Sequence, residues 1–143
     1  MHPREEAKRN LVRQWVAKAE KDLSLAEHLI AEEAPYPEAI AFNAQQAAEK
    51  YLKAFLVQHQ VEFPKTHNLG ELLRLIAPID PSLAESLADV IKLNPYGVEV
   101  RYPGDFPEVA TEAVISAVGL AAKVRTAVLA LLGPDLTQRY PED

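Results

Sequence analysis

The feature that most constrains the fold is a helical repeat of apolar residues between Tyr36 and Leu75. With a rotation of about 100° per residue, the apolar side chains of residues 37–60 fall on one half of a helical wheel. They are Ile40, Ala44, Ala47, Ala48, Tyr51, Leu52, Ala54 and Phe55. A helix with one apolar side is stable only when that side packs against other elements. This stretch therefore predicts a long helix inside a helical bundle.

Four further segments carry helix signals, and no strand pattern competes with them. A first helix is expected over residues 6–31, where an apolar stripe recurs every three or four residues. Its members are Leu11, Trp15, Ala19, Leu23, Ala26 and Ile30. The third helix is expected to begin near Thr66 as its N-cap, with an inward stripe of Leu69, Leu72, Leu73 and Ile76. A fourth is expected from Asp80 as cap and Pro81 as first position, with inward residues Leu83, Leu87, Val90 and Ile91.

The last helix is expected over residues 107–132, after a loop over residues 93–106. Gly133 and Pro134 end it, in the usual order of a glycine followed by a proline. Because it is rich in Ala, Val and Leu on most sides, we expect it near the centre of the bundle or at a subunit interface. The fold class is therefore all-α, an up-down bundle of three long and two short helices that resembles a four-helix bundle. A single domain over residues 1–133 is followed by a polar tail, 134–143.

The composition excludes several classes of protein. The chain has 143 residues and no cysteine, so disulfides, thiolate metal sites and cysteine nucleophiles are excluded. Only scattered histidines and no glycine-rich phosphate loop are present, so neither a metal centre nor a cofactor is expected. No apolar run approaches the length of a membrane span, and residues 1–10 lack the apolar core of a signal peptide. We therefore expect a cytoplasmic protein.

The net charge of −6 is unevenly distributed. Residues 1–21 carry six Lys and Arg against three Glu, whereas the remainder carries nine Lys and Arg against eighteen Asp and Glu. The acidic remainder argues against binding of long nucleic acid. The basic first helix either meets an acidic partner or a phosphate, or simply places its charges around a solvated face. Asp22, at the edge of the apolar stripe, needs a partner, for which Lys50 and Arg101 are candidates.

The polar side of the second helix is unusual for a solvated face. Its candidate interface residues are Phe42, Gln45, Gln46, Glu49 and Lys53. A Phe among amides and charges favours a covered surface, such as a partner interface or a ligand groove. The alternative is a single exposed apolar residue, which is common on protein surfaces.

Three blocks of residues carry a family resemblance. The first is residues 19–23 with Ala26. The second is residues 41–54, followed by residues 64–69 and Leu72. The third is Tyr96 with residues 101–103. Together these blocks resemble the HEPN family, the small helical "higher eukaryotes and prokaryotes nucleotide-binding" domains.

The resemblance implies a helical bundle that forms a homodimer, often encoded beside a minimal nucleotidyltransferase in a toxin–antitoxin-like pair. It also implies a role in binding a nucleotide or a protein partner. Many members of the family are metal-independent ribonucleases with an Arg, four to six intervening residues, and a His. That signature is absent, because the positions after Arg101 where the His would stand hold Phe106, Pro107 and Glu108. The sequence therefore favours an interaction module over an enzyme.

One polar group is a candidate ligand or phosphate site. It comprises Lys65, His67, Tyr96, Arg101 and Tyr102. Lys65 and His67 are expected at the start of the third helix, where free backbone N–H groups favour an anion. Arg101 offers a bidentate fork for phosphate, and the two tyrosines offer rings for stacking on a base. The alternative function is an atypical ribonuclease, in which His67 transfers the proton and Arg101 stabilises the charged phosphorus. Whether the two loops meet stays open at this point, and each side chain also has an ordinary structural role available.

Overall fold

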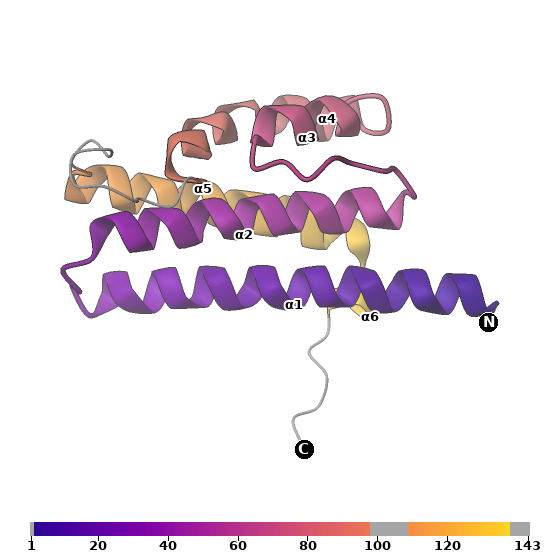
Figure 1. Ribbon diagram of the computed structural model, residues 1–143, viewed down its shortest axis with the longest axis horizontal. Helices are drawn as coiled ribbons and strands as arrows, with labels where there is room; N and C mark the ends of the chain where they lie inside the picture. The colour runs from indigo at the N-terminus through magenta and orange to yellow at the C-terminus, as the bar shows by residue number, and fades with distance from the viewer. Residues whose placement is uncertain (1, 98–108, 138–143) are drawn as a thin grey trace, which may run out of the picture.

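The computed structural model describes residues 2–97 and 109–137, and every regular element within these ranges is helical (Figure 1). In chain order the elements are α1 (Pro3–Ala31), α2 (Pro37–Gln58), α3 (Leu69–Ile76), α4 (Pro81–Ser86), the 3-10 helix η1 (Ala88–Gly97), α5 (Thr111–Leu132) and α6 (Pro134–Thr137). The helices pack against one another in a bundle, which confirms the predicted all-α class.

α2 is the central helix. It runs antiparallel to α1 and beside α5, and α3 and η1 lie across its remaining side (Figure 1). Thirteen of its 22 residues are buried, including the whole predicted apolar stripe. The last helix was expected near the centre or at a subunit interface, and of these the central place belongs to α2, because α5 buries only seven of its 22 residues. Alanines at several buried positions of α2 let its neighbours approach closely, so α2 takes the central place.

The buried stripe of α1 differs from the predicted one by a small rotation. Val12 and Val16 are buried, whereas Leu11 is 44% exposed and Trp15 is half-buried. Ala19, Leu23 and Ala26 are buried as predicted. Both sets of residues satisfy the spacing of three and four, and packing against α2 and α5 selects the side that carries the valines. The rotation leaves an apolar edge of α1 outside the core.

The region between α3 and α5 is more helical than predicted. Asp80 caps α4 as expected, since its Oδ1 accepts a hydrogen bond from the Leu83 backbone N–H at 3.0 Å. Leu83, Leu87 and Val90 are buried as predicted, but Ile91 is 48% exposed. The chain continues as η1 to Gly97, where a loop from residue 93 was expected. The change from α to 3-10 geometry moves Leu93 inward, and Ile91 turns outward.

The first residues of the expected tail are part of the fold. Gly133 ends α5 with a φ of 87°, and residues 134–137 then form α6. Leu136 is buried, and Asp135 accepts hydrogen bonds from Arg9 and Arg13 of α1. These contacts join α6 to the N-terminal half of α1. Residues 134–137 therefore belong to the folded domain and not to a polar tail.

α5 is long and apolar enough to cross a membrane by length and composition alone, with a mean hydropathy of 1.7. A helix that packs in the core of a soluble protein passes the same test, so one such helix is a weak indication. The sequence-based statement that no apolar run approaches a membrane span is corrected to this extent.

Candidate functional site

A ladder of buried polar side chains runs along α2. Gln45, Glu49 and Lys53 are four residues apart, so they lie above one another on one face of the helix. Gln45 is 0% exposed, Glu49 is 3% exposed and Lys53 is 6% exposed. Polar groups this deeply buried are costly unless they are hydrogen-bonded. Each must therefore find its partner within the fold.

Glu49 is the centre of this ladder. Its Oε2 accepts a hydrogen bond from Lys53 Nζ at 3.0 Å, and its Oε1 lies 2.8 Å from His67 Nδ1. The Gln45 side-chain amide donates to the backbone carbonyl of His67 at 2.9 Å. The contacts fasten the connection between α2 and α3 onto the face of α2, and both carboxylate oxygens of Glu49 are engaged.

Lys53 also lies between two aromatic rings. Its ammonium nitrogen is 5.5 Å from the centre of the Trp15 ring and 5.6 Å from that of Phe63. The two rings meet edge to face, with centroids 6.2 Å apart. A cation within about 6 Å of an aromatic face is attracted by the ring. Trp15 of α1 and Phe63 of the α2–α3 connection thus cover the buried end of the ladder.

The expected partner-binding face of α2 requires a correction. Gln45, Glu49 and Lys53 are covered by the chain itself, so they do not lie on an interface with another molecule. The cover comes from the α2–α3 connection and from η1, whose Gly97 packs on Gln45 so closely that an added Cβ would lie 2.9 Å from it. Phe42 and Gln46 remain half-buried at the edge of this region.

His67 has the geometry of a held but accessible imidazole. Its side chain is 69% exposed, while the carboxylate that holds it is only 4% exposed. Because an ionised carboxylate only accepts hydrogen bonds, Nδ1 carries the proton in this contact. In the neutral ring the Nε2 lone pair is then available. A carboxylate that fixes the tautomer of an exposed histidine is a common arrangement for proton transfer.

The predicted anion site at the start of α3 is wrong in its geometry. The helix begins at Leu69, and the N-cap is Asn68 and not Thr66. The Asn68 side chain accepts from the N–H groups of Gly70 and Glu71, and the Leu69 N–H donates to Asn94 at 2.8 Å. Since these backbone donors are satisfied within the fold, they are not free to hold a phosphate.

The remaining predicted site residues are placed differently. Lys65 is exposed in the α2–α3 connection, and no ion pair joins it to another described residue. Tyr96 is half-buried on η1 and packs against the core. Arg101 and Tyr102 lie outside the described residues. Gly97 nevertheless brings the end of η1 against Gln45, next to the His67 contact.

Two further ion-pair clusters join the helices. Asp22 of α1 pairs with Lys50 of α2 at 2.5 Å, which is one of the two partners expected for it. On another side of α1, Glu20 accepts from the buried Tyr51 hydroxyl and from Arg125 of α5. The contact between Tyr51 and Glu20 was not predicted from the sequence, because residues so far apart along the chain leave no local pattern. Among the described residues, no three His, Asp or Glu side chains converge as a metal site would require.

Comparison with known proteins places the chain in a family. The HEPN domain model matches residues 12–131, which is most of the chain. The protein belongs to the HEPN domain family. The match runs from within α1 to the last turn of α5, and the His67–Glu49 contact lies inside it. The family is one of helical nucleotide-binding and ribonuclease-type modules.

A solved structure supports the same fold for this HEPN domain. The crystal structure of TT1696 from Thermus thermophilus superposes with a TM-score of 0.66 and 27% sequence identity. The alignment covers 82% of this chain and 94% of the TT1696 chain. No curated protein matches the sequence. The family assignment made from residue blocks in the sequence is therefore confirmed.

Proposed function

We propose that this HEPN domain is an interaction module that binds a nucleotide at the surface around His67. The exposed imidazole, held by the buried Glu49, carries this proposal. Lys65 is two residues away, exposed and without an ion-pair partner among the described residues. The free ammonium of Lys65 supplies hydrogen-bond donors for a phosphate group, and Nε2 of the held imidazole adds another donor when the ring is protonated. Arg101 and Tyr102 are proposed to contribute to nucleotide binding, and for these two residues the proposal rests on the sequence alone.

The proposal includes protein partners. The family resemblance favours a homodimer and a partnership with a minimal nucleotidyltransferase in a toxin–antitoxin-like pair. The half-buried Phe42 and Gln46 and the exposed Ile115 and Leu131 of α5 are among the surfaces available for such contacts. The net charge of −6 disfavours long nucleic acid as a ligand. A cytoplasmic location is part of the same proposal.

A calorimetric titration with AMP and ATP tests the nucleotide site. Wild-type protein is expected to bind at least one of them. Replacing His67 or Lys65 with alanine is expected to weaken binding at least about tenfold, which is ~1.4 kcal/mol. Arg101→Ala is expected to have the same effect. Lys92→Ala, at an exposed lysine on η1, is the matched control and is expected to bind like wild type. Absence of binding, or equal binding by all variants, contradicts the proposal.

A second candidate function is ribonuclease activity, and the His67–Glu49 contact is the specific observation that favours it. His67 Nε2 would accept the proton of a ribose 2′-hydroxyl as its oxygen attacks the adjacent phosphorus. The bond from phosphorus to the 5′-oxygen breaks, and that oxygen takes a proton from the imidazolium. The products are a 2′,3′-cyclic phosphate and a 5′-hydroxyl, and Arg101 would stabilise the charged phosphorus.

Incubation with single-stranded RNA tests this second function. Wild-type protein is expected to cleave RNA, and His67→Ala and Arg101→Ala are each expected to lower the rate by about 10²-fold or more. Lys92→Ala again serves as the matched control. RNA that stays intact at high concentrations of wild-type protein rules the ribonuclease out and leaves the interaction module as the proposal.

A further inference from the structure

One edge of α1 is apolar at both ends and carries a lysine and a paired aspartate in the middle. Leu11, Trp15, Lys18, Asp22 and Leu25 recur at alternating spacings of four and three, so they form one ridge along the helix. Leu11 is 44% exposed and Leu25 is 46% exposed, and Trp15 is half-buried. The ridge from Leu11 to Leu25 is about 21 Å long at the rise of an α-helix.

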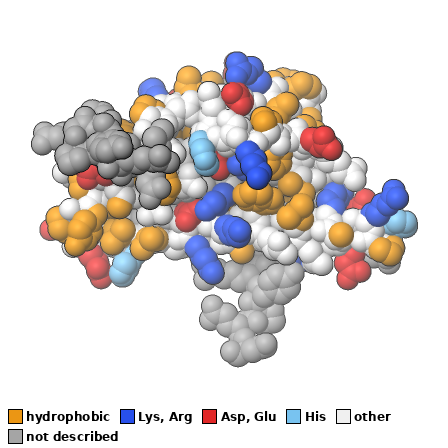
Figure 2. Space-filling model, in the orientation of Figure 1, with side chains coloured by type: hydrophobic (Ala, Val, Ile, Leu, Met, Phe, Trp, Pro, Cys, Tyr) orange, Lys and Arg blue, Asp and Glu red, His pale blue; other side chains and the backbone are white. Residues whose placement is uncertain are grey.

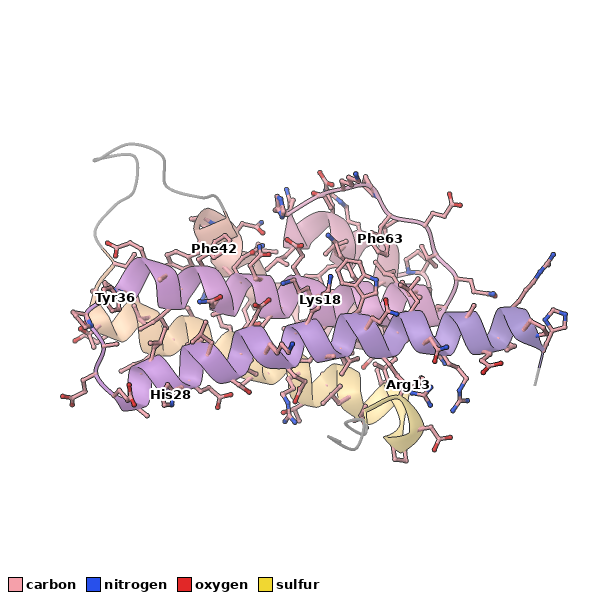
Figure 3. The ribbon with its side chains drawn as sticks, turned by 60° about the horizontal axis from the view of Figure 1, so that its bottom comes forward. Arg13, Lys18, His28, Tyr36, Phe42 and Phe63 are labelled. Carbon is pink, nitrogen blue, oxygen red and sulfur yellow. The ribbon has the colours of Figure 1, made fainter. Side chains whose placement is uncertain are left out.

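The ridge borders α2, and the two helices together form a seam. Asp22 pairs with Lys50 of α2, and Trp15 contacts Lys53 of the same helix. Lys18 stands between these two contacts, and Figure 3 shows it on the edge of α1 beside α2. Arg13 instead points toward α6, to which it is hydrogen-bonded. We call the surface formed by the ridge with Lys21, Lys50 and Val57 the α1–α2 seam.

The seam carries positive charge that the fold does not neutralise. The carboxylates of Asp22 and Glu49 are each paired with a lysine of α2. Lys18 and Lys21 are exposed and have no ion-pair partner among the described residues. In Figure 2, Lys and Arg side chains, drawn in blue, gather in the middle of the face that α1 and α2 present. The rest of the chain is acidic, so the positive seam stands out against it.

We propose that the α1–α2 seam docks an amphipathic acidic helix of a partner protein. Apolar residues near the two ends of that helix contact Leu11 with Trp15 at one end and Leu25 at the other. Asp or Glu residues in its middle pair with Lys18 and Lys21. The length of the ridge fits a helix of about four turns. Charge complementarity of this kind sets the register and the rate of association.

A protein helix fits the seam better than a polynucleotide does. The free cations are lysines, whereas bidentate recognition of phosphate favours arginine. The exposed leucines at the ends have no counterpart in a chain of phosphates, but they match the anchors of a helix that lies in a groove. The net charge of −6 also repels a polymer of high negative charge density. An acidic helix meets less of that repulsion, because it carries fewer negative charges per unit length than a polynucleotide.

Fluorescence anisotropy with synthetic peptides tests the proposal. The probe is an alanine-based helix of about 18 residues, with leucines near both ends and glutamates in the middle of one face. One comparison peptide has lysines in place of the glutamates, and another has the same composition in scrambled order. A single-stranded RNA of similar length is the fourth ligand. Wild-type protein is expected to bind only the patterned acidic peptide.

Variants locate the contact on the seam. The double substitution Lys18→Glu and Lys21→Glu is expected to weaken binding of the acidic peptide at least about tenfold, because attraction becomes repulsion. Leu25→Asp is expected to weaken it to a similar degree by removing an apolar anchor. Lys92→Glu changes an exposed lysine on η1 and is expected to leave binding unchanged. Circular dichroism verifies that each variant is folded.

Each outcome decides for or against the seam. RNA binding that depends on Lys18 and Lys21, with no peptide binding, overturns the proposal in favour of a polyanion surface. Equal binding of the patterned and scrambled peptides, or no peptide binding, also overturns it. The seam residues differ from those tested with AMP and ATP, so failure of the nucleotide site leaves this result independent. Loss of AMP binding in His67→Ala with peptide binding retained would separate the two surfaces.

Discussion

Replacing Glu49 with alanine is expected to lower the free energy of unfolding by about 3–5 kcal/mol, because it leaves a buried ammonium without its carboxylate. The side chains of Glu49 and Lys53 are 4% and 8% exposed, so water replaces the lost partner poorly. The change also removes the acceptor of His67 Nδ1. Urea denaturation followed by circular dichroism measures the loss.

Two matched variants separate the buried charge from a general effect of losing a glutamate. Glu62→Ala, at an exposed glutamate in the α2–α3 connection, is expected to change stability by less than about 0.5 kcal/mol. The double variant Glu49→Leu and Lys53→Met removes both charges, and is expected to recover most of the loss because no unpaired ion remains. A loss below about 1 kcal/mol in Glu49→Ala would mean that the ladder is hydrated.

The ladder also shows why its position was misjudged from the sequence. Gln45, Glu49 and Lys53 repeat at helical spacing on the polar side of α2, which was expected to face a partner or a ligand. Their burial depends on His67, which lies 22 residues after Gln45 and contributes its backbone carbonyl to Gln45 and its ring to Glu49. Contacts made by a loop that folds back leave no periodic signal. His67 itself was identified as a candidate, but its partner was not.

Local signals predicted the fold well where one solution was much better than the others. The apolar stripe of α2 has one possible phase, and Asp80 and Gly133 have clear roles as cap and terminator. The prediction failed where neighbouring solutions were nearly equal. Leu11 and Val12 are adjacent in the sequence of α1, and Thr66 and Asn68 are both good N-caps. Tertiary contacts with α2 and α5 in the first case, and with Asn94 in the second, decided the outcome.

The second large effect expected is a loss of stability at alkaline pH that depends on Tyr51. The Tyr51 side chain is fully buried, and its hydroxyl donates to Glu20 Oε1 at 2.5 Å. Burial, followed by the hydrogen bond and charge of Glu20, raises the pKa of Tyr51 well above its usual value of about 10. Arg125 on the same carboxylate acts in the opposite direction but does not outweigh burial. The phenol therefore keeps its proton in the folded chain under conditions in which the unfolded chain loses it.

The direction of the effect follows from the protons bound in each state. Below pH of about 10 both states hold the Tyr51 proton, and the contribution is fully present. Above that pH the unfolded chain binds fewer protons, so the free energy of unfolding falls by up to about 1.4 kcal/mol per pH unit.

Tyr51→Phe is expected to flatten this slope, while it costs about 1 kcal/mol at neutral pH through the lost hydrogen bond. Tyr36→Phe, at a tyrosine that is 59% exposed, is the matched control and is expected to keep the wild-type slope. Urea denaturation across a pH range that spans the usual tyrosine pKa of about 10 measures all three proteins. Equal slopes for wild type and Tyr51→Phe would show that water reaches the hydroxyl, and that Glu20 does not join α1, α2 and α5 through a buried contact.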